Sequence, residues 1–232
     1  FQGLNAEKSN SQALAILEIS AKRAGFRSVE FIYEPIAAGL DFECQLTQDK
    51  KVLVIDIGGG TSDCAMVRMG PSHRDKADRE EDFIGHNGER IGGNDFDIQI
   101  AAKALLPLFG MNSFLKSGLP MPTQVYRNAV ATNDIGAQAE FNNLQTSMLI
   151  DRLLIETKEP VLFKRFFKIR QKKLNQHLVA SAEQAKIQLS KIMRVDVPLD
   201  YVEDALSSEI TFEIMKEAVR GPLIQMTSLL NE

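Results

Sequence analysis

Three consecutive glycines, Gly58–Gly60, constrain this chain more than any other feature of its sequence. Each glycine costs about 0.5–1 kcal/mol in lost chain entropy when it is held in a regular element. A run of three is therefore expected where the backbone adopts a positive φ or passes very close to a ligand. The run lies between two strand-like segments, 51–56 and 61–69. The sequence thus predicts an antiparallel hairpin with a glycine turn.

The polar residues around this turn are typical of a phosphate site. Backbone N–H groups of a glycine-rich turn can surround phosphate oxygens. Asp56 and Asp63 flank the turn, and carboxylates next to phosphates indicate Mg²⁺ held through water. Thr61 adds a hydroxyl for the terminal phosphate or for a water. The alternative is an ordinary tight turn with polar flanks, and the sequence has neither the P-loop spacing nor the GxGxxG spacing here.

Hydrophobic periodicity and turn residues predict the other elements. Helices are expected over residues 9–24, from Pro35 to about Leu46, from about 94 to 109, over most of 138–191 with an interruption at Pro160, and over 212–230 with a break at Gly221-Pro222. Strands are expected over 29–33, 51–56, 61–69 and, weakly, 195–201. The strand over 51–56 is typical of one buried on both faces of a sheet. Residues 71–82 are expected to form an exposed loop, 85–93 a turn-rich stretch and 110–133 an irregular one.

Composition excludes several classes of protein. The chain has 232 residues, of which 44% are hydrophobic and 25% charged, as in folded soluble proteins. A net charge of −4 argues against nucleic-acid binding through bulk charge. Two cysteines outside any CxxC pair indicate a reducing compartment. No apolar run approaches the roughly 18 residues of a membrane helix, so we expect a cytoplasmic protein with no membrane partner.

The two ends of the chain predict a piece of a longer protein. The chain opens with Phe1-Gln2-Gly3, without a methionine, and closes inside a helical pattern at Leu229–Glu232. The opening residues fit either the remnant of a cleavable tag or native strand sequence.

Four segments in order resemble the DnaK-type heat-shock chaperones of the actin-like ATPases. VLVIDIGGGTSD at 52–63 resembles their second phosphate motif, and YEPIAAGL at 33–40 resembles their Asn-Glu-Pro-Thr-Ala-Ala segment. RIGGNDFD at 90–97 is similar to Leu-Gly-Gly-Glu-Asp-Phe-Asp, and AEQAKIQLS at 182–190 is similar to their Glu-Arg-Ala-Lys-Arg-Thr-Leu-Ser helix. The details look most like the divergent YegD branch.

The resemblance implies an α/β fold of the actin-like, ribonuclease H-like class, with nucleotide held between two lobes. Residues 1–48 would be the end of lobe I. Residues 49–91, rejoined by 221–232, would form the sheet subdomain of lobe II. Residues 92–220 would form its helical subdomain, with an insertion at about 107–155 on which the resemblance says nothing.

Carried over residue by residue, the resemblance also implies roles at the phosphate end of the nucleotide. Glu34 and Asp56 would hold Mg²⁺ through its waters. Gly58, Gly59, Gly60 and Thr61 would surround the β- and γ-phosphates, and Asp63 would orient the attacking water or the metal shell.

For the adenosine end, Gly92 and Gly93 would border the nucleotide cleft, and Glu183, Lys186 and Ser190 would reach the ribose and base. Spacings of three and four put these last three on one helix face, where a solvated polar stripe is the ordinary alternative. Ile187 stands where the chaperones have an arginine that stacks on adenine, which removes a cation–π partner. The first phosphate loop, the catalytic lysine and the last Gly-Gly motif of the family are not in this sequence.

Other candidate residues have simpler explanations. His73, His86 and His177 have no ligand-like spacing to Cys44 or Cys64, which argues against a metal site, and Cys64 fits a small core residue. The basic stretch 164–173 with interleaved aromatics is more typical of an amphipathic helix with a solvated basic face than of a surface for nucleic acid or an acidic partner.

The sequence therefore predicts an ATP-binding and ATP-hydrolysing chaperone-like protein, with ATP or ADP and Mg²⁺ as ligands. A protein client or co-chaperone is the further partner that the resemblance implies. Two alternatives stay open: a nucleotide sensor with little hydrolysis, which Ile187 favours, and a kinase or filament protein of the same fold.

Overall fold

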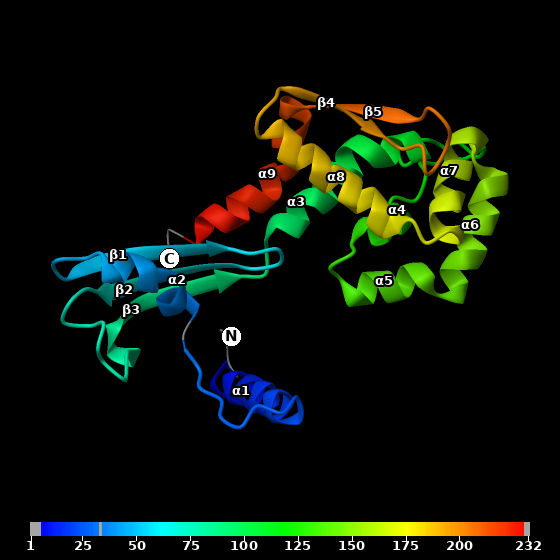
Figure 1. The fold of residues 1–232 in the computed structure, drawn as a ribbon. Helices are drawn as coiled ribbons and strands as arrows, with labels where there is room; N and C mark the ends of the chain where they lie inside the picture. Colours follow the sequence, from blue (N-terminus) through cyan, green and yellow to red (C-terminus); the bar gives the residue numbers. More distant parts are fainter. Residues whose placement is uncertain (1–5, 33, 230–232) are drawn as a thin grey trace. The chain divides into compact units, whose positions relative to one another are not determined.

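The computed structural model describes residues 6–32 and 34–229. The chain divides into two compact units, one of residues 1–90 with 226–232 and one of residues 91–225 (Figure 1). The expectations for Phe1–Gly3 and for residues 230–232 fall outside the described residues.

The first unit contains a three-stranded antiparallel sheet in the order β1-β2-β3. Its strands are β1 (Lys50–Ile57), β2 (Ser62–Met69) and β3 (Phe83–Glu89). The predicted β1–β2 hairpin is confirmed, with Ile57 opposite Ser62 next to the turn. The turn-rich expectation for 85–93 is wrong over its first half, because β3 pairs with β2 there. Gly85 and Gly88 hide the strand pattern in the sequence.

Two helices precede the sheet, α1 (Ala6–Arg23) and α2 (Glu34–Cys44), close to the predicted ranges. The strand expected over 29–33 is wrong, since residues 29–32 have no regular structure and Tyr33 lies outside the described residues. The Phe31 and Ile32 side chains are exposed. A strand needs a neighbour to satisfy its backbone N–H and C=O groups, and none of the strands within residues 6–32 and 34–229 pairs with 29–32.

Helix α2 packs on one face of the sheet. Ile36 and Leu46 form a buried cluster with Ala65, Val67 and Met69. Gly39 lies so close to the Met69 side chain that a Cβ at this position would overlap it. Helix and sheet therefore approach closely only because residue 39 has no side chain.

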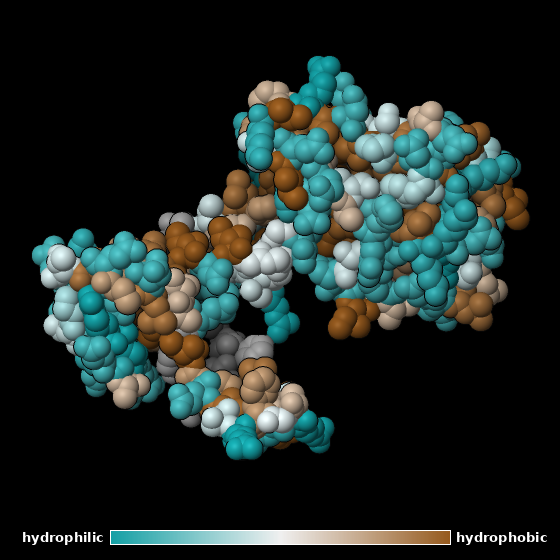
Figure 2. Space-filling model, in the orientation of Figure 1, coloured by the Kyte–Doolittle hydropathy of each residue, from teal (hydrophilic) through white to brown (hydrophobic). Residues whose placement is uncertain are grey.

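The other face of β1 is exposed, so the expectation that β1 is buried on both faces is wrong. Leu53, Ile55 and Ile57 are each about half exposed, and they alternate with the half-buried Val52, Val54 and Asp56. Figure 2 shows hydrophobic surface on this unit. A continuous apolar run does not say which of its residues find a packing partner.

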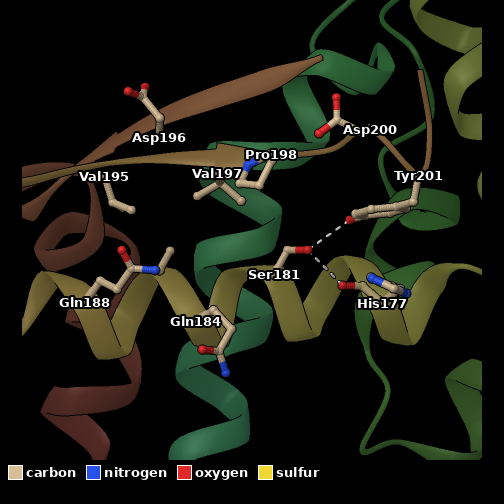
Figure 3. Close-up of a pocket in the computed structure, with 11 residues that line it drawn as sticks. His177, Ser181, Gln184, Gln188, Val195, Asp196, Val197, Pro198, Asp200 and Tyr201 are labelled. Atoms are coloured by element: carbon tan, nitrogen blue, oxygen red, sulfur yellow. Dashed lines mark hydrogen bonds between the residues drawn. The ribbon is translucent and has the colours of Figure 1, made fainter. Parts of the chain in front are cut away.

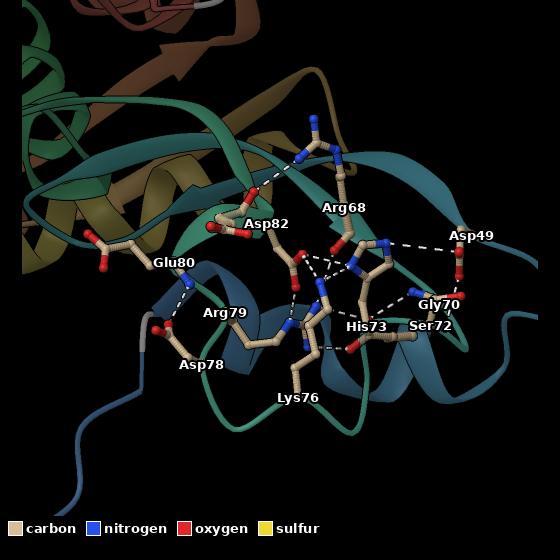
Figure 4. Close-up of polar contacts among 12 residues, drawn as sticks. Asp49, Arg68, Gly70, Ser72, His73, Lys76, Asp78, Arg79, Glu80 and Asp82 are labelled. Atoms are coloured by element: carbon tan, nitrogen blue, oxygen red, sulfur yellow. Dashed lines mark hydrogen bonds and ion pairs between the residues drawn. The ribbon is translucent and has the colours of Figure 1, made fainter.

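The charged segment 71–82 is largely exposed, as expected, but ion pairs hold it (Figure 4). The Arg79 guanidinium donates to both carboxylate oxygens of Glu43 at 3.0 Å and to Asp82. Lys76 Nζ and His73 Nδ1 lie 3.1 and 2.7 Å from Asp82 Oδ1. Glu43 and Asp82 are buried, so this network fastens the segment to the C-terminal end of α2.

Two carboxyl pKa values reflect this network. Burial raises the pKa of Glu43, but hydrogen bonds from Arg79 and from the Gly70 N–H outweigh burial and lower it below 4.5. Burial likewise raises the pKa of Asp82, and hydrogen bonds from Lys76, Arg79 and His73 bring it below 3.8. Both groups are thus held as carboxylates in the folded protein.

The second unit is mainly helical. Its helices are α3 (Gly93–Ile100), α4 (Gln124–Val130), α5 (Ile135–Asn142), α6 (Leu144–Glu156), α7 (Pro160–Gln171), α8 (Asn175–Leu189) and α9 (Phe212–Ser228). A π-helical segment η2 (Ala101–Leu105) and a 3₁₀ turn η3 (Leu106–Phe109) extend α3. Strands β4 (Arg194–Pro198) and β5 (Ser207–Thr211) form an antiparallel pair.

Aromatic residues fill the core of the second unit. The Tyr126 and Phe166 rings are 4.1 Å apart between centroids, and Phe163 and Phe141 pack around them. Burial raises the pKa of the Tyr126 hydroxyl, which donates to the Phe109 carbonyl. Much of the segment 107–155 therefore belongs to this core, because Phe109, Tyr126 and Phe141 come from it.

Three expectations for the second unit are corrected. The stretch 110–133 contains α4. Pro160 begins α7, at a position whose N–H would have no helical partner in any case, so the interruption is a helix start. Helix α9 continues through Gly221 and Pro222, although a break was expected there. Strand β5 was not expected and pairs with the weakly predicted β4.

Within residues 6–32 and 34–229, no helix is long and apolar enough to span a bilayer.

The Arg79 network yields a stability prediction. Replacing Arg79 with Met leaves the buried Glu43 and Asp82 without their shared cation, which costs about 3–5 kcal/mol when a buried pair is broken. Arg68→Met is the matched control, since exposed Arg68 donates to the Glu81 carbonyl, and this variant should lose about 1 kcal/mol. Hydrogen exchange of the sheet amides measures both effects, and equal losses would contradict the assignment.

The same network makes the first unit sensitive to acid. A carboxyl whose pKa is lowered by folding stabilises the protein above its unfolded pKa and loses this contribution as the pH falls through the folded pKa. The free energy of unfolding should therefore fall between about pH 5 and pH 3. Glu43→Gln should flatten this slope, measured by denaturant unfolding at each pH. An unchanged slope would show that Glu43 does not titrate as described.

Candidate functional site

The glycine turn between β1 and β2 is a short loop closed by its own backbone. The Gly58 N–H donates to the Thr61 carbonyl at 2.8 Å, and Ile57 and Ser62 are already paired as strand residues. All four loop residues, Gly58–Thr61, are exposed. The turn therefore presents bare backbone to its surroundings, as a phosphate-binding loop requires.

Backbone conformation does not explain these glycines. None of the three has the positive φ that favours glycine. A Cβ at Gly60 would meet nothing within 4 Å, and one at Gly58 would lie 3.3 Å from the Thr61 carbonyl oxygen. A glycine run is expected either for a positive φ or for close approach by a ligand. For Gly60 only the second reason remains, because a side chain would fill the open space that a ligand could occupy.

Asp56 and Asp63 face each other across the hairpin as directly paired residues. Directly opposite residues of an antiparallel pair point to the same face of the sheet, and both side chains are half-buried. Like charges at such a position are destabilising. This arrangement favours a cation nearby.

A glycine that the sequence analysis did not single out makes room for Asp63. Gly88 on β3 is opposite Asp63, and a Cβ at residue 88 would overlap the Asp63 carboxylate. The carboxylate therefore lies across the neighbouring strand. The only sequence signal for this contact is the pair of glycines in β3. Its meaning is visible only once β3 is known to lie beside β2.

Glu34 begins α2 and is exposed. The opposite end of α2 is held at the far end of β2, where Glu43 accepts from the Gly70 N–H at 2.9 Å. In between, Gly39 lies against Met69 and Val54. This direction points the start of α2, with Glu34, toward the hairpin end of the sheet.

The described residues contain no group of three or more His, Cys, Asp or Glu side chains arranged to hold a metal ion directly. The donor set of the hairpin is carboxylate and exposed backbone. Mg²⁺ keeps several waters and binds through one or two carboxylates together with phosphates, so this donor set fits a hydrated Mg²⁺ accompanying a nucleotide.

The second group of predicted residues lies in the second unit, at the start of α3 and on α8. Gly92 is buried and precedes α3, and its N–H donates to the Asp95 carboxylate at 2.8 Å. Lys186 Nζ donates to the Gly93 carbonyl at 3.1 Å. These contacts fix the start of α3 against α8.

Lys186 is chiefly engaged by a carboxylate. Its Nζ lies 2.8 and 3.0 Å from the two oxygens of Asp97, whose side chain is 4% exposed. Burial raises the pKa of Asp97 above 3.8, hydrogen bonding and charge from Lys186 oppose this, and the charge of Glu183 adds to it. The structure thus brings Gly93, Glu183 and Lys186 together around a buried acid that sequence reasoning assigned no role.

The remaining α8 candidates face solvent. Glu183 and Ser190 are exposed, and the Ser190 hydroxyl donates to the Ile187 carbonyl at 2.7 Å. Ile187 is 48% exposed although it is apolar. The predicted polar stripe is therefore accessible, with an apolar side chain in its middle.

The weaker candidates are accounted for by packing. Phe166 and Ile169 of the basic stretch are buried, as is Phe163 just before it in α7, whereas Arg165 pairs with Glu203 at 2.8 Å. Lys168 donates to the Val202 carbonyl and Arg170 to the Asn143 carbonyl. This pattern is the amphipathic helix expected as the simpler alternative. His73 is bound to Asp82, Cys64 is half-buried in β2 and Cys44 is exposed.

Comparison with known proteins gives two partial matches. The family model described as MreB/Mbl protein matches residues 7–102, which span α1 to the start of η2. A curated relative, "Chaperone protein dnaK" of Emiliania huxleyi, is 33% identical over 82 residues, or 35% of this chain. The match spans 12% of the length of that relative.

These matches support the sequence interpretation at a coarse level. MreB/Mbl is a family of the actin-like ATPase superfamily, and the observed mixture of helices and sheet is consistent with the α/β class. Together with the partial DnaK similarity, the match supports a nucleotide-binding, ATPase-type function at the family level.

The Lys186–Asp97 pair gives a test of the second unit. Lys186→Met leaves a buried carboxylate without its cation and should destabilise this unit by about 3 kcal/mol. Adding Asp97→Asn should recover part of the loss, because the uncompensated charge disappears. Lys103→Met is the matched control, since Lys103 pairs with the exposed Glu217 and should change stability by at most about 1 kcal/mol. Denaturant unfolding with hydrogen exchange measures all three; a loss of similar size in Lys103→Met would overturn the assignment.

Proposed function

We propose that the protein containing this chain binds ATP and ADP with Mg²⁺ at the Gly58–Thr61 turn and hydrolyses ATP, as a chaperone-like protein of the DnaK type and of the YegD branch. The observation that carries the proposal is the exposed glycine turn, open at Gly60 and flanked by the paired Asp56 and Asp63. The turn lies within both the family match and the segment that resembles the chaperones.

Each residue of the hairpin has a separate role in this proposal. The N–H groups of Gly59 and Gly60 and the Thr61 hydroxyl bind β- and γ-phosphate oxygens. Asp56 and Glu34 accept hydrogen bonds from the waters of Mg²⁺, and Asp63 orients the attacking water. Gly58 shapes the turn, because its N–H is used by the Thr61 carbonyl.

Phosphoryl transfer requires positioning and charge neutralisation more than covalent chemistry from the protein. Mg²⁺, when bound, supplies charge neutralisation at the phosphate oxygens. The turn contributes fixed N–H dipoles that need no reorganisation during the reaction. The Asp63 carboxylate lies over Gly88, where a Cβ would overlap it, and Asp63 follows the turn at the start of β2.

The adenosine contacts are proposed for the second unit. Gly92 and Gly93 border the nucleotide, and Glu183, Lys186 and Ser190 bind ribose and base. Lys186 would have to share its ammonium with Asp97 to do so, because the pair is already formed. The accessible face of α8 at Glu183 and Ser190 supports this assignment.

A nucleotide sensor with little hydrolysis is the second candidate. The exposed Ile187 favours it, since it stands where the resembling chaperones stack an arginine on adenine. Single-turnover hydrolysis by the full-length protein distinguishes the two: release of phosphate from bound ATP supports the ATPase, and stable ATP binding without release supports the sensor.

Isothermal titration of Mg·ATP and Mg·ADP into the full-length protein tests the phosphate site. Gly60→Ala should weaken binding at least about tenfold, because the methyl group would occupy the space assigned to phosphate. Gly85→Ala is the matched control, since a Cβ there also meets nothing within 4 Å but lies on β3 away from the turn. Asp56→Ala should abolish the Mg²⁺ dependence.

Gly88→Ala tests the position of the Asp63 carboxylate without removing its charge. It leaves Asp63 in the chain but pushes its flexible carboxylate away from β3. Turnover should fall while nucleotide affinity changes little, as a water-positioning role requires. Absence of binding by the wild type, or equal binding by Gly60→Ala and Gly85→Ala, would refute the phosphate site.

A further inference from the structure

A groove lies between α8 and β4 (Figure 3). It has a volume of about 390 Å³. Gln184, Gln188 and Ser181 contribute from α8, and residues 195–198 contribute from β4. His177 and Tyr201 close one end, with ring centroids 4.3 Å apart and the Tyr201 hydroxyl 3.1 Å from that of Ser181.

Among the described residues, no other strand pairs with the edge of β4 that faces away from β5. The Phe212 N–H donates to the Met193 carbonyl and the Leu199 N–H to the Leu206 carbonyl, on either side of the β4–β5 ladder. Hydrogen-bonded pairs alternate along an antiparallel ladder. Val195 and Val197 are therefore bonded to β5, and the N–H and C=O groups of Asp196 point to the open edge.

An open strand edge is a template for another strand. The open edge of β4 is short, because Pro198 has no N–H and ends the run of donors. Such a length is suited to a short extended segment rather than to a large sheet. The amides of Gln184 and Gln188 beside the edge can hydrogen-bond the same segment.

Side chains of β4 indicate the charge of the occupant. Figure 3 shows Val195 and Val197 pointing toward α8 and Asp196 pointing away from it. A strand added to this edge would alternate in the same way. Its residue opposite Asp196 would face a carboxylate with no cation from β4, since Arg194 is paired with Glu209 at 3.1 Å. Asp200, four residues after Asp196, adds a second negative charge at the groove.

We propose that the α8–β4 groove binds an extended basic peptide segment of a partner protein as an added strand on the edge of β4. Its main chain bonds to the Asp196 N–H and C=O. Arginine or lysine side chains lie on the outer face next to Asp196, and the alternate, uncharged side chains enter the groove over Gln184 and Gln188. This site does not depend on the nucleotide proposal.

Fluorescence anisotropy with labelled peptides tests the site on the complete chain. The probe is a seven-residue peptide of alternating Arg and Val, compared with the same peptide carrying Glu for Arg and with one N-methylated at alternate residues. We expect saturable binding of the Arg peptide only. The Glu peptide fails through charge repulsion, and the N-methylated peptide fails because it cannot donate to the strand edge.

Two charge-reversal variants make the test specific. Asp196→Lys should weaken the binding of the Arg peptide at least about tenfold. Glu213→Lys, an equal charge change at an exposed position of α9, should leave binding unchanged. Gln184→Trp should block the groove without touching the edge, with circular dichroism checking that each variant folds. No binding by the wild type, equal losses in the two Lys variants or full binding of the N-methylated peptide would overturn the proposal.

Discussion

The Arg79 guanidinium joins three parts of the first unit that are far apart in the sequence. It bonds to Glu43 at the end of α2, to Asp82 before β3 and to the Arg68 carbonyl on β2. The planar fork of Arg79 makes four hydrogen bonds, to two buried carboxylates and one carbonyl, whereas a lysine has only three donors on a single atom. With its C-terminal end held beside Gly70 in this way, α2 starts on the hairpin side of that contact, and Glu34 is its first residue.

The glycines of the first unit serve different physical purposes. Gly39 permits close packing of α2 on Met69, and Gly88 makes space for the Asp63 carboxylate. A Cβ at Gly60 would meet nothing within 4 Å. Gly85 has the same open space at its Cβ position. The turn is therefore connected with a ligand by open space at Gly60 together with the flanking, directly paired Asp56 and Asp63, and not by open space alone.

Local patterns predicted those elements whose signal lies within their own residues. The β1–β2 hairpin and helices α1, α2 and α8 have such signals in their apolar periodicity and turn residues. Strand β3 was not predicted, because its glycines hide the strand pattern and its pairing with β2 cannot be seen in the sequence. The segment 29–32 was predicted as a strand, but no described strand pairs with it. The ion network of 71–82 depends on Glu43, 36 positions before Arg79, so the charges of the segment predicted an exposed loop but not what holds it. At the candidate site, the motif residues were recognisable from the sequence. The contact of Gly88 with Asp63 and the ion pair of Asp97 with Lys186 could be found only from the fold.

The second unit is inserted within the first. Residues 91–225 form one compact body, and the chain then returns at 226 to the body that it left at 90. During synthesis, the sheet with its hairpin can form from nearby residues, since β1, β2 and β3 are consecutive. The returning residues 226–229 become available only after the whole inserted body has been made. The entropic cost of closing a loop rises only slowly with its length. The cost of closing residues 91–225 is therefore small if these residues have already folded into their compact body. Folding of the aromatic core around Tyr126 is therefore expected to precede completion of the unit that carries the glycine turn.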